Sequence, residues 1–389
     1  MRPQLDTTTL SVPRSKHTNH KDKYKERLVF GFRRKSPAVP PATPVQPGER
    51  MQWHSPPQRH LDTIVFVHGI LGHYVRTWGQ FPKLLSEDEE LPEFDILLWG
   101  YRTGWFSRHY ELQTEAAHLA TSLQALVRPG SDIVLVGHSM GGLVILKALV
   151  DRMDLGEAQL HPCASITWIS LFASPLNGVW LAGIARRVFL IPMWALRGLH
   201  RHLRDLSRGS FVTDLMSRVT SCIYQPQVED KGNRRIPIRI IAATRDRAVA
   251  AKDRNAALAP YKNPAAQQLD ETHTSIKEPT SREEVRYKVL ATDLQQAITG
   301  TFRRLCSTVM DAATTSGDRE VMVEDIRRRY GKLIRLRLST VKIPEDQQES
   351  AENDLVLLIA DYGAAHEEPP FSAVHRAATI LEARHKDWR

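Results

Sequence analysis

One stretch of six residues constrains this chain more than any other. Residues 137–142 read Gly-His-Ser-Met-Gly-Gly; they follow the apolar run Ile133–Val136 and precede a helix-like segment. This order of strand, Gly-x-Ser-x-Gly turn and helix is typical of a nucleophile elbow, whose sharp turn holds the serine in a strained backbone conformation. Side chains at positions 137 and 141 would collide with neighbouring backbone, so both positions favour glycine. The pattern predicts that Ser139 is a nucleophile beside a helix N-terminus, whose dipole stabilises developing negative charge.

A second glycine motif lies earlier in the chain. The strand-like run Thr63–Val67 ends in His-Gly-Ile-Leu-Gly, residues 68–72. Attack on an ester produces a negative oxygen that is stabilised by two preformed donors, usually backbone N–H groups. The position of the motif predicts that Ile70 supplies one N–H and Met140, which follows the nucleophile, supplies the other. We interpret His68 as a structural hydrogen-bonding residue, because it precedes the serine and lies beside this loop.

An acid and a base are expected downstream, in the order Ser, Asp, His. Asp246 follows the buried-strand pattern Ile236–Ala243, at the carboxyl end where catalytic groups collect in parallel sheets. His273 lies in a polar loop, whereas the later histidines lie in a charged C-terminal region. Other acidic residues before the base are Asp205, Asp214, Asp230 and Asp253, of which Asp253 is the alternative to Asp246. The predicted roles are Ser139 as nucleophile, His273 as general base and then acid, and Asp246 as the group that orients the imidazole.

These motifs resemble a known family. Residues 67–72 with Arg-Thr-Trp at 76–78, followed by residues 137–144, are similar to the lipase-type α/β-hydrolases of the serine-active-site-containing protein group. Glycosylphosphatidylinositol inositol deacylases and bacterial esterases are more distant relatives. Residues 172–178 depart from the Thr-Pro-His-x-Gly-like segment of that group, since Leu176 and Asn177 stand where its histidine is expected. The resemblance covers about residues 60–300 and implies ester hydrolysis or acyl transfer on lipid-like substrates, without fixing the substrate.

The basic charge of the chain is concentrated at one end. The net charge is +9, and residues 1–60 hold 12 Lys/Arg against 4 Asp/Glu, a surplus of 8. This segment is also rich in proline and predicts a disordered tail. Such charge runs are most often simply solvated; attraction to an anionic membrane is the sharper alternative, and no nucleic-acid partner is expected.

Targeting and metal signals are weak. There is no early apolar run for a secretory signal. The early basic, Thr and Ser residues leave mitochondrial import as an alternative, although acidic residues in the tail count against it. The three widely spaced cysteines favour a reducing compartment, so we expect an intracellular protein, cytoplasmic or at a membrane periphery. His200 and His202 lie in an arginine-rich segment, and no residue cluster has metal-ligand spacing. No metal and no other cofactor are expected, and the oligomeric state stays open.

Alternating strand and helix patterns predict helices on both faces of a mostly parallel sheet, and the resemblance given above implies that this is an α/β-hydrolase fold. We expect a tail at 1–60, a hydrolase domain at 61–300 with a helical cap insertion at about 176–232, and a helical extension at 301–389 that the core does not need. The expected strands are Thr63–Val67, Asp95–Trp99, Asp132–Val136, Ser165–Phe172 and Ile236–Ala243. One helix is expected at Gln113–Val127, and Ser281 with Glu284 predicts a capping box for the last core helix.

Two functional questions stay open at this level. Residues 179–197 combine tryptophans and large apolar residues with arginines, which suits either the surface of an anionic bilayer or an ordinary cap helix. In the second case the substrate would be a small soluble ester. The alternative to an enzyme is a catalytically silent protein that kept the fold in order to bind a partner.

Overall fold

The protein is represented by a computed structural model of residues 1–389. The structure describes residues 51–55, 57–58, 62–70, 72–101, 112–158, 160–176, 210–224, 236–246, 266–311, 314–341, 343, 347–366 and 368–384. All of these belong to one compact unit of the chain.

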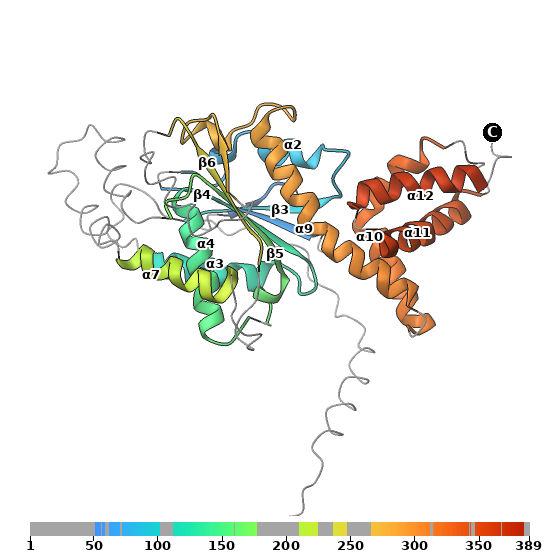
Figure 1. Cartoon of the computed structure of the whole chain (residues 1–389), viewed down its shortest axis with the longest axis horizontal. Coiled ribbons are helices and arrows are strands. Elements are labelled where there is room, and N and C mark those ends of the chain that lie inside the picture. Colours follow the sequence, from blue (N-terminus) through green and yellow to red (C-terminus); the bar gives the residue numbers. More distant parts are fainter. Residues whose placement is uncertain are drawn as a thin grey trace, which may run out of the picture. The chain divides into compact units, whose positions relative to one another are not determined.

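The described residues contain a seven-stranded sheet with the strand order β1-β3-β2-β4-β5-β6-β7 (Figure 1). Its strands are β1 (Met51–Trp53), β2 (Asp62–Val67), β3 (Phe94–Trp99), β4 (Ile133–His138), β5 (Ile166–Phe172), β6 (Ile238–Ala243) and β7 (Ala266–Leu269). All neighbouring strands run parallel except β1, which pairs antiparallel with β3 at the edge. The predicted α/β class with a mostly parallel sheet is therefore confirmed, and each of the five expected strands is present within one or two residues.

Helices cover both faces of this sheet, and three more follow it. They are α2 (Phe81–Ser86), α3 (Leu112–Leu126), α4 (Met140–Asp154), α7 (Ser210–Val219), α9 (Val285–Met310), α10 (Ser316–Leu338), α11 (Gln348–Ala365) and α12 (Pro370–Arg384). The predicted helix at 113–127 is α3, and its last residue, Leu126, is 39% exposed.

Successive side chains of strand β2 pack into two different hydrophobic cores, one on each face of the sheet. Val65 and Val67 pack into the cluster formed with α3, α4 and α7, whereas Ile64 and Phe66 pack into the cluster formed with α2 and α9. Successive side chains of a strand point to opposite faces, so an unbroken apolar run is what a strand covered on both faces requires. Burial of each such side chain contributes about 1.5–3 kcal/mol.

Two of the expected domain boundaries need correction. Residues 51–53, which we assigned to the tail, form the edge strand β1, with Trp53 opposite Leu97 of β3. Helix α9 runs through position 300 without interruption. Its first half packs against the sheet through Leu290 and Leu294, and its second half enters a third core through Phe302 and Cys306. This third core is shared with α10, α11 and α12.

The expected capping box is also wrong. Helix α9 begins at Val285, so Glu284 is its N-cap residue and Ser281 lies too far upstream to cap it. The Glu284 carboxylate instead accepts hydrogen bonds from the backbone and the hydroxyl of Thr280.

The C-terminal helices contact the hydrolase layers directly. Arg329 of α10 is buried; it forms an ion pair with Asp62, the first residue of β2, and donates to the carbonyl oxygen of Gly130. Lys332, one turn further on, donates to the carbonyl oxygens of Ser86 and Asp88 at the end of α2. The extension is therefore bound to the core through charged groups; whether the core folds without it stays a prediction.

The segment 176–232, which we expect to form a cap, is described only in part. Leu176 at its start is buried, and α7 near its end places Val212, Leu215 and Val219 in the core beside α4. Residues 177–209 and 225–235 lie outside the described residues. Among the described helices, none has both the length and the apolar character that crossing a membrane requires.

Candidate active site

The turn after β4 places Ser139 in a conformation that few residues adopt. Its φ of 56° and ψ of −125° lie outside the regions favoured by L-residues, and α4 begins at the next residue. The turn is also sterically closed, because a Cβ at Gly141 would lie 2.1 Å from the carbonyl oxygen of Val67. A Cβ at Gly137 would lie 2.7 Å from the Cα of Gly142. The collisions with backbone that we predicted at positions 137 and 141 are therefore confirmed.

The loop after β2 lies against this turn. Strands β2 and β4 are neighbours, with Val67 opposite Gly137, and a Cβ at Gly69 would lie 2.6 Å from the Cβ of Ser139. Ile70 follows and is half-buried. Met140 is the first residue of α4, so its N–H belongs to the first-turn donors that have no partner within the helix. Both predicted oxyanion residues thus lie on segments that flank the serine.

His68 holds the loop after β2 in place. It is buried, its Nδ1–H donates to the carbonyl oxygen of Gly69 over 2.7 Å, and its Nε2 accepts from the backbone N–H of Tyr101 over 3.3 Å. Its ring also stacks on that of Tyr101. These contacts are those of a structural residue, as the sequence indicated.

Asp246 and His273 are brought together at the carboxyl edge of the sheet. Asp246 lies three residues after β6, and His273 lies four residues after β7. The imidazole Nδ1–H donates to Asp246 Oδ2 over 2.8 Å. The side chain of Asp246 is 0% exposed and that of His273 is 21% exposed. This bond fixes the neutral tautomer of His273 and leaves the lone pair on Nε2.

The loop of His273 also touches the turn of Ser139. His138, the residue before the serine, donates from Nε2 to the carbonyl oxygen of His273 over 2.9 Å, and the two rings lie 4.9 Å apart. Ser139 is fully buried, and its Oγ has no hydrogen-bond partner among the described residues. Nucleophile and base often join closely only once a substrate is bound.

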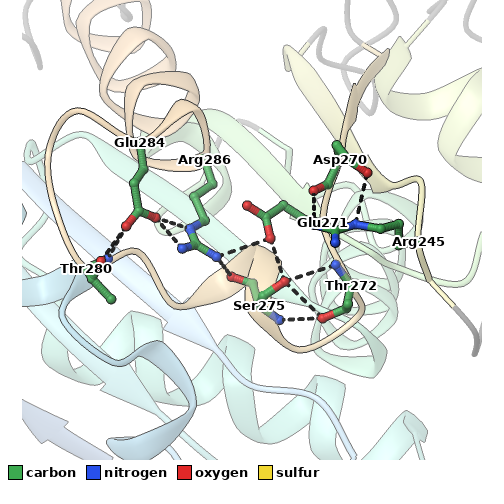
Figure 2. A network of polar contacts seen from close by, with 8 residues as sticks. All are labelled: Arg245, Asp270, Glu271, Thr272, Ser275, Thr280, Glu284 and Arg286. Carbon is green, nitrogen blue, oxygen red and sulfur yellow. Dashed lines mark hydrogen bonds and ion pairs between the residues drawn. The ribbon is translucent and has the colours of Figure 1, made fainter.

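A polar network that the sequence did not indicate surrounds the loop of His273 (Figure 2). It joins side chains from the loop after β6, the loop after β7 and the start of α9. The spacing of the charged residues at 245, 270, 271, 284 and 286 does not show which of them face each other.

Several other positions singled out in the sequence lie outside the part of the chain that the structure describes. Asp253, the alternative acid, lies outside the described residues, and so do His200, His202 and the Trp-Arg segment 179–197. Among the described residues, no three His, Cys, Asp or Glu side chains gather where they could bind a metal ion.

Comparison with known proteins gives one curated relative and several solved structures. Protein SERAC1 from Danio rerio is 29% identical over 182 residues, which cover 38% of this chain and 27% of that protein. The matched part is thus about a quarter of the relative's length. Est1E from Butyrivibrio proteoclasticus has 17% identity and a TM-score of 0.43, covering 64% of this chain and 93% of that chain. The lipase BlEst2 of Bacillus licheniformis has 17% identity and a TM-score of 0.38, covering 63% and 97%.

The family comparison covers the segment that carries the site. The sequence model of the Alpha/beta hydrolase family matches residues 64–278, more than half of the chain. This range begins in β2 and includes Ser139, Asp246 and His273. From the parallel sheet, the strained serine after β4 and this match, we conclude that the chain belongs to the alpha/beta hydrolase family.

Proposed function

We propose that the protein is a serine hydrolase that cleaves or transfers acyl groups of lipid-like carboxylic esters through a Ser-His-Asp triad. Membership in the alpha/beta hydrolase family supports hydrolase activity. The observation that carries the finer proposal is the 2.8 Å bond between His273 Nδ1 and Asp246 Oδ2, next to the strained turn of Ser139. An acid, a base and a serine from three different strand ends meet at one edge of the sheet.

In the first half of the proposed reaction, His273 Nε2 takes the proton of the Ser139 hydroxyl as the oxygen attacks the ester carbonyl. Asp246 stabilises the imidazolium that forms and keeps its ring in position. The tetrahedral oxyanion accepts hydrogen bonds from the N–H groups of Ile70 and Met140. Collapse of this intermediate breaks the C–O bond, and His273 gives its proton to the departing alcohol.

In the second half, the acyl group is an ester of Ser139. His273 takes a proton from water or from an acceptor alcohol, whose oxygen attacks the acyl carbonyl. Collapse of the second tetrahedral intermediate releases the acid or the new ester, and the proton returns to Ser139. No metal or organic cofactor takes part in these steps.

The proposed substrate class comes from two features of the sequence. Lipid-like esters follow from the resemblance of the two glycine motifs to lipase-type hydrolases and from the apolar segment 179–197. A fluorophosphonate probe tests the nucleophile without any knowledge of the substrate. We expect the wild type to be labelled and Ser139→Ala to be unlabelled, because removal of a nucleophile lowers rates by several orders of magnitude.

The same experiment separates the enzyme from a silent binding protein. If neither protein is labelled at any pH between 6 and 9, the enzyme proposal fails and the binding alternative stands. Where labelling occurs, a series of nitrophenyl esters of increasing acyl length identifies the class: rates that rise with chain length support lipid-like substrates, and rates highest for acetate contradict them.

A further inference from the structure

We propose that Arg286 and Glu271 form a clamp that positions the loop of His273, and that both are positioning residues for the active site. The inference rests on the proposed function, because it gives His273 the role of base. It adds one residue from α9 and one from the start of the loop after β7, both outside the three predicted triad positions.

The loop is first closed on itself around His273. Thr272 N–H donates to Ser275 Oγ over 3.0 Å, and Ser275 N–H donates to Thr272 Oγ1 over 3.1 Å. Ser275 Oγ–H in turn donates to Glu271 Oε2 over 2.5 Å. The residues on either side of His273 are thus joined by side chain–backbone bonds, which hold a short turn without any regular ladder.

Arg286 then fastens this closed turn to α9 (Figure 2). Its Nη1 donates to the carbonyl oxygen of Ser275 and pairs with Glu271 Oε2 at 3.2 Å. Its remaining N–H groups contact the Glu284 carboxylate at the N-cap of α9. One guanidinium therefore holds the loop two residues before His273 and two residues after it.

A second set of contacts ties the loop to the segment of Asp246. Arg245 N–H donates to the carbonyl oxygen of Glu271 over 2.9 Å, and Arg245 Nη2 donates to that of Asp270 over 2.6 Å. The acid and the base are consequently held on two segments that are hydrogen-bonded to each other, with Glu271 shared by both sets of contacts.

The environment of Arg286 favours a positioning role over a surface ion pair. Its side chain is 13% exposed, so its bonds are screened by water much less than those of exposed pairs. It bonds a backbone carbonyl and two carboxylates at once, which requires the rigid fork of several donors that arginine has and lysine lacks. A displacement of about 1 Å at His273 is enough to lower a catalytic rate by about 100-fold.

Matched control variants exist on α9 and in the segment just before it. Lys288 pairs with Glu283, is 57% exposed and does not contact the loop in any bond that the structure records among the described residues. Thr280 bonds Glu284 from the far side of the network, so Thr280→Ala loosens the start of α9 without touching residues 271–275. A role limited to anchoring α9 would make Thr280→Ala and Arg286→Met behave alike.

The first measurement tests how firmly the bond between His273 and Asp246 is held. Proton NMR of the full-length protein should show a downfield Nδ1–H resonance of His273 bound to Asp246, assigned by its loss in His273→Gln. In Arg286→Met and in Glu271→Gln we expect this proton to exchange with water at least about ten times faster, since local opening governs such exchange. Lys288→Met and Thr280→Ala should keep the wild-type rate. Absence of the resonance in the wild type, or an unchanged rate in both clamp variants, would overturn the proposal.

The second measurement tests the reactivity of Ser139. Fluorophosphonate labelling of Ser139 should slow by about 10- to 100-fold in Arg286→Met, with the saturating rate lowered and half-saturation unchanged. Both assays are run well below the thermal midpoint of each variant. Should the wild type show no labelling while the Nδ1–H exchange still responds to Arg286→Met, the serine hydrolase proposal fails and the clamp stands. Normal labelling with a wild-type exchange rate in Arg286→Met contradicts the clamp alone.

Discussion

His138 donates a hydrogen bond from Nε2 to the backbone carbonyl oxygen of His273, across 135 positions of the sequence. The bond joins the turn of the candidate nucleophile to the loop of the candidate base. The other ring nitrogen of His138, Nδ1, is buried without a hydrogen-bond partner among the described residues. Protonation would place an unsatisfied donor there, so the site favours the neutral ring. Burial, and then the nearby His273 and Lys277, hold the pKa of His138 well below its ordinary value of 6.5.

This depressed pKa predicts a pH-dependent loss of stability. Below pH 6.5 His138 is protonated in the unfolded chain but stays neutral in the folded protein. The free energy of unfolding therefore falls as pH decreases. The slope from one such group approaches about 1.4 kcal/mol per pH unit. His138→Phe should remove it, which urea unfolding between pH 5 and 7 measures. His118→Gln, at a side chain that is 69% exposed, should keep the wild-type slope. Equal slopes in wild type and His138→Phe would contradict the buried neutral ring.

Gly69 is the position where the loop after β2 comes closest to the nucleophile. An added Cβ would lie 2.6 Å from Ser139 Cβ and 3.0 Å from the carbonyl oxygen of His138. We expect Gly69→Ala to lower stability by about 1–3 kcal/mol and to slow probe labelling at least about tenfold. Gly300→Ala is the control, because nothing lies within 4 Å of its Cβ inside α9. That change should stabilise the protein by about 0.5–1 kcal/mol. Wild-type labelling in Gly69→Ala would show that the loop moves freely.

The identity of the acid is tested by comparing two aspartates. Asp246→Asn removes the charge that orients and stabilises the His273 ring, so kcat should fall by about four orders of magnitude with a small change in thermal midpoint. Asp253→Asn should leave kcat within about threefold of the wild type, because that residue has no role in the proposed triad. The reverse ranking of the two variants would assign the acid to Asp253.

The sequence predicted those parts of the fold that are buried on both sides. The five central strands are mostly apolar and mostly buried, and their position between helices required little further information. The edge strands were missed: β1 is three residues long, and β7 reads Ala-Gln-Gln-Leu. An edge strand buries few side chains and so leaves little apolar pattern. We expected α9 to begin after Ser281, with Glu284 completing a capping box, but Glu284 accepts hydrogen bonds from Thr280 and the helix begins at Val285. Residue propensities do not show which of two adjacent hydroxyl residues, Thr280 or Ser281, bonds the glutamate.

In the candidate site, too, the sequence could indicate some of the residues and not others. Ser139 and Asp246 could be nominated because each follows an expected strand, and strand ends of a parallel sheet converge. His273 was nominated from its polar loop and its place in the chain after Asp246, since β7 was not expected. The contacts of Arg286 with Ser275 and Glu271 could not be nominated, since they depend on the path of the loop between β7 and α9. The burial of Arg329 against Asp62 was equally hidden, because α10 carries many arginines and the sequence does not show which one faces the sheet.

Contact with an anionic membrane is a proposal about the segment 179–197, which lies outside the described residues. Trp194 and the pair Arg186 and Arg187 would rest at the bilayer surface, and the basic tail would add attraction to anionic lipid. Flotation with anionic and neutral liposomes should show binding to the anionic vesicles alone, lost at high salt. If the triple change to alanine leaves binding and lipid turnover unaltered, the segment is an ordinary cap.

The C-terminal helices are expected to stabilise the hydrolase layers through Arg329. The burial of Asp62 raises the pKa of its carboxyl to about 6 despite the adjacent guanidinium. Removing that guanidinium in Arg329→Met leaves a buried charge without its partner, which costs about 3–5 kcal/mol at pH 7.5. Chemical unfolding measures this loss. Arg335→Met, at an exposed residue 3.9 Å from Glu93, should change stability by less than about 0.5 kcal/mol.

The pH dependence of Arg329→Met separates a lost ion pair from lost packing. Because the folded pKa of Asp62 is above its ordinary value of 3.8, the penalty of its charge is present at high pH and disappears as pH falls through the folded pKa. Without Arg329 that pKa lies higher still, so Asp62 takes up a proton earlier as the solution is acidified. The stability difference between wild type and Arg329→Met should therefore shrink between pH 7.5 and pH 5. A difference that stays constant over this range would mean that Arg329 acts through packing alone, and a difference below about 0.5 kcal/mol at pH 7.5 would mean that the extension is held without this pair.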